Sequence, residues 1–392
     1  RPSYKLFSKI CSPTHRLTDL RAAHALAAYL LAALVATWPL VLGLGRDVAW
    51  DLGDSVLNMW ILGWDCEQIR HMLSGDLSRL ATFFDANVFY PAPLSLAFSE
   101  HLVPQAIQIL PVYLVSRNLI LCYNLLFLST FALSGLGMFL LMRELTGNRA
   151  GAFVAGLLFA FAPYRLAQAS HLQVLSSQWM PFTLYGFLRY FRSSPGALAP
   201  PQRRPIAPLA GATMALAVQA LSCGYYLLFF TPFAVAFALW EIGRQRLWRD
   251  RAMWLQLGVA AVCAVVVIVP FVLPYAAIRG AFASRSIAET SRFAADVYSY
   301  ASAVPEQRVW GRALQAMPQP EGKLFPGLVP LVLALIGLLA AVPRRGPTVI
   351  APCTRRPRWL SWLLAVLAVG HGLAAVAALV LRRIVIELGP FV

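Results

Sequence analysis

Long apolar runs interrupted by few charges constrain this chain more than any other feature of its sequence. A helix needs about 20 mostly apolar residues to cross roughly 30 Å of hydrocarbon, and several runs reach or approach that length. Only 13% of the residues are charged, whereas soluble domains have about a quarter. Because a helix satisfies its own backbone hydrogen bonds in lipid, the sequence predicts an all-α polytopic membrane protein.

The apolar runs predict about nine membrane helices, with ends uncertain by a few residues. The expected spans are residues 22–45, 119–142, 150–164, 174–190, 207–222, 224–242, 253–278, 326–342 and 359–381. Residues 101–117 are also apolar, but they are short for a span and contain two prolines.

The distribution of charge decides whether residues 101–117 cross. If they do not, and if the N-terminus is cytoplasmic, all five cytoplasmic pieces are basic and together hold 20 of the 33 Lys and Arg residues. The pieces are 1–21, 143–149, 189–205, 241–251 and 343–358. A crossing would invert every later loop against the positive-inside rule. We therefore interpret 101–117 as a re-entrant or interfacial helix on the outer face, with outer loops at 46–118 and 279–325; that the membrane is a bacterial inner membrane is implied only by the family resemblance given below.

Charge and motifs argue against several other classes of protein. The net charge of +16 resides largely in short loops between apolar runs, so we expect a membrane partner and no nucleic acid. The six cysteines contain no CxxC pair, so the sequence indicates neither a zinc site nor a disulfide framework. No nucleotide-binding motif is present, so chemistry outside the membrane would need a donor that is already activated. Because the chain begins at Arg1, we expect residues to precede it.

The stretch WDLGDS, residues 50–55, places two carboxylates just after the first expected span. Apolar residues then recur at helical spacing, which predicts an amphipathic helix over 55–73 lying on the outer surface. Asp54 immediately precedes this run and suits a helix N-cap. A carboxylate between lipid headgroups and water can also act as general base toward an acceptor hydroxyl. Both roles remain open for Asp54.

The layout resembles the GT-C superfamily of polytopic glycosyltransferases, which includes protein mannosyltransferases and aminoarabinose transferases. The resemblance covers roughly residues 20–330, through the first span, WDLGDS, the surface helix, FYP, SEHLVPQ and HLQVLSSQWMP in that order. It implies a membrane core over 22–342, preceded by a cytoplasmic segment 1–21 and followed by a basic loop and last span in 343–392. It also implies sugar transfer from a polyprenyl-phosphate donor to a hydroxyl on the outer face.

Carried onto this sequence, the resemblance makes Asp54 the catalytic aspartate of the first loop, acting as general base, with Asp51 as second candidate. The family's second outer loop often carries an acid, but residues 164–173 contain none. A divalent metal is therefore possible but not indicated, and we expect no other cofactor. The chain stops at Val392, earlier than many members, and is either incomplete or a reduced member.

Other polar residues of the outer loops are candidates for substrate binding. Arg165 follows Pro163 at the end of a span and is either an interfacial arginine or a phosphate ligand. His171 and Gln173 suit sugar hydroxyls or local packing. Glu100 and His101 could tune proton transfer, or the acid could favour a helix dipole. Lys323, in the last outer loop, could meet a phosphate.

Two alternatives remain for the function. One is a transporter or flippase of a lipid-linked glycan, although no internal repeat is evident and the spans carry few charges. The other is a non-catalytic subunit of a larger complex with a protein partner. An enzyme predicts a cavity that joins Asp54, Arg165 and His171, whereas a structural subunit does not.

Overall fold

The computed structural model describes residues 20–49, 51–193, 204–281, 286–305, 307, 309–316 and 321–341. These residues form helices and turns, and no strand occurs among them beyond an isolated bridge between Ser302 and Gln315. They fall into two compact units. The first covers 20–161 and 168–281, and the second covers 162–167 and the described residues after 281.

Four helical stretches of the described chain are long and apolar enough to cross a membrane. They are Leu119–Thr146, Arg149–Ala167, Gly224–Gln245 and Arg251–Ile278. Shorter apolar helices cover Ala22–Ala36, Val103–Ser116, Ile206–Ser222 and Leu328–Leu338. The chain is thus all-helical in its described part and compatible with a membrane protein. About nine spans are not confirmed, and the expected span 359–381 lies outside the described residues.

In the first unit, α4 (Leu119–Thr146) contacts α1 (Leu20–Ala36), α5 (Arg149–Ala160) and α8 (Trp179–Arg192). Small residues let these helices approach closely. A methyl group added at Gly156 would lie 2.1 Å from the Tyr29 hydroxyl oxygen and 2.7 Å from the Gly135 carbonyl oxygen. The Tyr29 hydroxyl donates to the Phe153 carbonyl at 3.0 Å. Glycine is therefore required for this packing.

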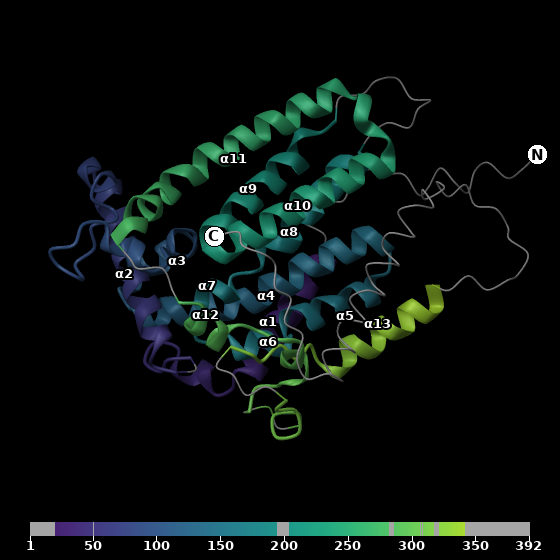
Figure 1. The fold of residues 1–392 in the computed structure, drawn as a ribbon, viewed down its shortest axis with the longest axis horizontal. Coiled ribbons are helices and arrows are strands. Elements are labelled where there is room, and N and C mark those ends of the chain that lie inside the picture. Colours follow the sequence, from purple (N-terminus) through teal and green to yellow (C-terminus); the bar gives the residue numbers. More distant parts are fainter. Residues whose placement is uncertain are drawn as a thin grey trace, which may run out of the picture. The chain divides into compact units, whose positions relative to one another are not determined.

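A second group of helices in the same unit begins after residue 203. The helix α9 (Ile206–Ser222) contacts α8, α10 (Gly224–Gln245) and α11 (Arg251–Ile278), and α9 to α11 run side by side in Figure 1. The expected span 174–190 is instead divided into α7 (Leu172–Leu175) and α8. Gln219 of α9 donates to the Ser176 carbonyl at 2.9 Å, so a tertiary hydrogen bond holds the break between α7 and α8.

The expected surface helix is present as α2 (Asp54–Leu73), but it is not amphipathic as predicted. It contacts α3 (Val103–Ser116) and α4, and the side chains that it buries include Asp65 and Gln68 together with Ile61 and Leu62. Because polar and apolar residues share the buried face, α2 is a packed core helix on that side. Residues 46–118 also contain η2 (Leu77–Leu80) and η3 (Ser95–Phe98), and η1 (Leu40–Gly43) lies shortly before them.

The second unit contains α6 (Pro163–Ala167), α12 (Ile287–Phe293), η6 (Val297–Ala301) and α13 (Leu328–Ala341). The short helices η4 (Leu247–Arg249) and η5 (Arg279–Ala281) belong to the first unit. In the second unit Asp296 and Ser299 form a reciprocal capping box at the start of η6. Trp310 packs on Phe325 at 5.7 Å between ring centroids. Capping and aromatic packing thus order much of the expected loop 279–325.

Candidate functional site

Asp54 lies in the first turn of α2, where the structure gives it a partner far away in the sequence. The N-cap of the helix is Gly53, and no side chain caps this helix end. The predicted capping role of Asp54 is therefore wrong. Its Oδ2 instead lies 2.9 Å from Nε2 of His171, which precedes α7. The structure brings together two of the residues that the sequence singled out, across more than one hundred residues of chain.

The surroundings of His171 indicate which ring nitrogen carries the proton. Its Nδ1 is buried and has no hydrogen-bond partner among the described residues. A proton there would be a buried donor without an acceptor, whereas a lone pair can stay unpaired at lower cost. We therefore assign the proton to Nε2, so that His171 donates to the Asp54 carboxylate. The other carboxylate oxygen, Oδ1, has no contact within the described part of the chain.

A second residue of α2 holds the His171 segment in place. Asn58 lies one helical turn after Asp54, so both side chains project from the same face. The buried Asn58 amide donates from Nδ2 to the Ser170 carbonyl at 3.2 Å. Asn58 escaped the sequence analysis, although its i,i+4 spacing from Asp54 was a usable signal.

The segment after His171 is tied from the opposite side by α9 and α10. Gln219 contacts the Ser176 carbonyl, and the Tyr226 hydroxyl donates to the Val174 carbonyl at 2.5 Å. Gln173 lies within α7, half-buried, and its Oε1 has no hydrogen-bond partner in the described residues. These contacts make α7 a fixed platform beside Asp54 and not a mobile loop.

Asp51, the second catalytic candidate, has a local structural role. Its Oδ1 accepts the Gly53 backbone N–H at 2.9 Å, as in an Asx turn, and the residue is exposed. Asp51 therefore shapes the turn that leads into α2, and no contact joins it to His171.

Glu100 caps a helix remote from it in sequence. Both of its carboxylate oxygens accept the Gly224 backbone N–H, at 2.9 and 3.1 Å, where α10 begins. Burial raises the pKa of Glu100, although the hydrogen bonds from Gly224 and Cys223 act to lower it. The helix-dipole interpretation of this acid is right in kind, but the helix is α10 and not the one that begins beside it.

His101 is a core residue and not a proton-transfer group. Its ring packs against Phe271 at 5.1 Å and more loosely against Phe84 and Tyr275. The ring is almost entirely buried, which lowers the pKa of His101 to about 4. The expected tuning of Asp54 by His101 has no contact to support it.

The remaining predicted site residues belong to the second unit. Arg165 lies in α6 and is buried, and Lys323 is half-buried ahead of α13. Within this unit Pro163 packs beside Gly327: a methyl group added at Gly327 would lie 3.5 Å from Pro163 Cγ. Of the three residues expected to share a cavity, Asp54 and His171 belong to the first unit and meet there, whereas Arg165 belongs to the second unit.

An apolar groove of about 940 Å³ runs along α9 and α11 in the first unit. Its walls include Met214 and Val218 on α9, Val259 and Val267 on α11, and Ile107 on α3. On α9 the lining extends from Ile206 to Leu221, which is about 22 Å at 1.5 Å per residue. Sequence analysis missed this groove because both of its helices read simply as apolar spans.

Within the described residues no group of three His, Cys, Asp or Glu side chains is arranged to hold a metal ion. In a comparison with protein families, residues 87–385 match the family described as a domain of unknown function (DUF6311). The chain therefore belongs to this family. No curated protein and no solved structure matches it.

Proposed function

We propose that this member of the DUF6311 family is a membrane glycosyltransferase of the GT-C type, which moves a sugar from a polyprenyl-phosphate donor to a hydroxyl acceptor. The observation that carries the proposal is the hydrogen bond from His171 Nε2 to Asp54 Oδ2 at 2.9 Å. The pair is reachable, because the Asp54 side chain is 49% exposed and that of His171 is 30% exposed. A carboxylate oriented by an imidazole, with one oxygen left over, is suited to accept a proton.

In this mechanism Asp54 Oδ1 takes the proton of the acceptor hydroxyl. The acceptor oxygen forms a bond to the anomeric carbon of the sugar, and the bond from that carbon to the donor phosphate oxygen breaks. Polyprenyl phosphate leaves with the electron pair, and the configuration of the sugar inverts. His171 keeps the carboxylate in position through Nε2–H, and Asn58 fixes the backbone that carries His171.

The apolar groove supports a lipid-linked donor and not a soluble one. Its lining is almost wholly apolar, and a polyprenyl chain has no polar group to satisfy there. The groove reaches Val103 and Phe271, close in the structure to His101, whose ring packs on Phe271. A donor chain in the groove would therefore emerge beside the layer formed by α2 and α3.

The decisive experiment is transfer of a radiolabelled hexose from synthetic polyprenyl phosphate, using purified full-length protein in lipid nanodiscs. We expect Asp54→Asn to abolish transfer because the amide cannot accept the proton. Asp51→Asn is the matched control: it makes the same change three residues earlier, and its contact to Gly53 is local. Near-normal turnover by Asp54→Asn would refute the assignment. Loss in Asp51→Asn alone would move the base to Asp51.

A further inference from the structure

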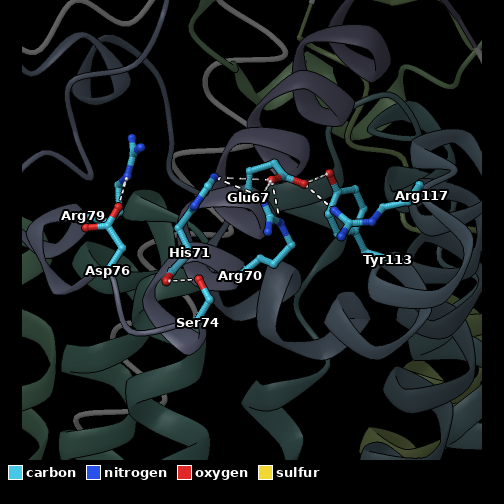
Figure 2. Close-up of polar contacts among 8 residues, drawn as sticks. All are labelled: Glu67, Arg70, His71, Ser74, Asp76, Arg79, Tyr113 and Arg117. Atoms are coloured by element: carbon cyan, nitrogen blue, oxygen red, sulfur yellow. Dashed lines mark hydrogen bonds and ion pairs between the residues drawn. The ribbon is translucent and has the colours of Figure 1, made fainter.

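A second polar cluster lies at the opposite end of α2 and takes no part in the proposed transfer. Figure 2 shows Glu67 at its centre, with Arg70 and His71 from the same helix and Tyr113 and Arg117 from the end of α3. Arg70 donates to Glu67 Oε2 from Nε at 2.8 Å and from Nη2 at 2.7 Å. Arg117 Nη1 and the Tyr113 hydroxyl donate to Oε1 at 2.6 and 2.5 Å.

One carboxylate thus holds two guanidinium groups close together. Burial acts to raise the pKa of Glu67, but the hydrogen bonds from Arg70 and Tyr113 and the two positive charges keep it below its ordinary value. Glu67 is therefore ionised, and its single negative charge lies between the two positive charges of Arg70 and Arg117. His71 Nε2 lies 3.0 Å from Arg70 Nη2.

The arginines have donors left over. A guanidinium carries five N–H groups in a planar fork, and the contacts to Glu67 use two nitrogens of Arg70 and one of Arg117. The side chains are 32% and 50% exposed, respectively. The remaining N–H groups of the two side chains can donate to an incoming oxyanion while Glu67 keeps its contacts.

Exposed apolar side chains lie near the cluster along the chain, interspersed with polar residues. Arg117 stands two residues ahead of α4, the apolar candidate span that begins at Leu119. Five large apolar side chains close to these arginines in the sequence are exposed: Leu73, Leu77 and Leu80 follow Arg70, and Leu114 and Val115 precede Arg117. Arginines between exposed leucines at the end of an apolar helix are typical of the headgroup level of a bilayer.

We propose that Arg70 and Arg117, held together by Glu67, form a binding site for the phosphate of an anionic phospholipid whose acyl chains lie on the surrounding leucines. The site is separate from the Asp54–His171 pair and does not depend on the proposed transferase activity. The apolar surroundings favour a lipid over free phosphate, because a soluble anion would gain nothing from the exposed leucines.

The test compares lipid retention in full-length protein purified in a neutral detergent. Native mass spectrometry counts bound phosphatidylglycerol and phosphatidylcholine as each is titrated. The test variant is E67Q/R70Q/R117Q, which removes one negative and two positive charges. The matched control is R79Q, because Arg79 pairs with Asp76 at 3.0 Å on the same surface and its loss changes the net charge equally.

We expect the triple variant to bind phosphatidylglycerol roughly thirtyfold more weakly, because each basic side chain near an anionic headgroup contributes about a fivefold factor. R79Q should bind like the wild type, and phosphatidylcholine binding should not change. Arg117→Gln alone, at a half-exposed residue, should lose about fivefold and serves if the triple variant does not fold.

Unchanged phosphatidylglycerol binding in the triple variant, or in R117Q when it is used, would overturn the proposal. Equal loss in R79Q would overturn it too, because net charge would then explain the binding. A third arm adds inorganic phosphate to the wild type with phosphatidylglycerol bound. Displacement of the lipid by millimolar free phosphate would show a soluble ligand and contradict the lipid site.

Discussion

The coupling between Asp54 and His171 can be measured with a double-mutant cycle of Asp54→Asn and His171→Gln. The structure separates the effects of these changes on stability and on chemistry. Because the two side chains are 49% and 30% exposed, their hydrogen bond should contribute only about 0.5–1 kcal/mol to folding. Removal of a general base costs roughly 10²- to 10⁴-fold in rate, which is about 3–5 kcal/mol of barrier. A loss of activity on that scale therefore cannot come from unfolding.

The expected rates follow from the assigned roles. Asp54→Asn should lower transfer by at least about a hundredfold, and His171→Gln by roughly ten- to a hundredfold because the carboxylate loses its orientation. The double variant should be no slower than Asp54→Asn, because His171 acts only through Asp54. Initial rates of hexose transfer in nanodiscs give these values, and thermal melting of each variant checks the fold. Multiplicative losses in the double variant would show that His171 acts independently of Asp54 and would refute the dyad.

Two further substitutions test the packing that positions the site. The Asn58→Asp variant places a carboxylate oxygen, which can only accept, against the Ser170 carbonyl oxygen. Because Asn58 is 3% exposed, the free energy of unfolding should fall by about 2 kcal/mol or more. Its melting temperature should fall well below that of the wild type; an unchanged value would deny the Asn58–Ser170 bond. His101→Phe tests burial through pH. Because the folded pKa of about 4 lies below the unfolded value of about 6.5, wild-type stability is full above pH 6.5 and falls by about 3 kcal/mol toward pH 4. Between pH 7 and pH 4.5 the melting temperature of His101→Phe should therefore fall less than that of the wild type. An equal fall in both proteins would contradict the burial of His101.

The sequence predicted the apolar helices well because their signal is local. Residues 119–142 and 207–222 were expected as spans, and the helices cover Leu119–Thr146 and Ile206–Ser222. Length and apolar composition are enough for such elements, since a helix in lipid closes its own backbone hydrogen bonds. The expected span 174–190 failed at Ser176, where Gln219 from another helix accounts for the break. Nothing near Ser176 in the sequence announces that partner.

The candidate site shows the same division between local and distant information. Asp54 and His171 were each singled out from their surroundings, but only the fold places them 2.9 Å apart. His101 stood beside an acid and looked like a proton-transfer partner. Its real environment is Phe84 and two aromatic residues of α11, which lie about 170 residues further along the chain. No short-range pattern encodes an aromatic cluster of this kind.

The helix α2 separates the two polar sites by its length. From Asp54 to Arg70 it rises 16 residues, which is about 24 Å at 1.5 Å per residue. The middle of α2 is packed against its neighbours, with Ile61, Leu62 and Asp65 fully buried, so the helix holds its two ends at this separation. Substitutions that far apart and without shared partners should act additively. E67Q/R70Q/R117Q should therefore leave hexose transfer by the Asp54 site unchanged in detergent to which no phosphatidylglycerol has been added. A loss of transfer in that variant would show that α2 couples the two ends instead of holding them apart.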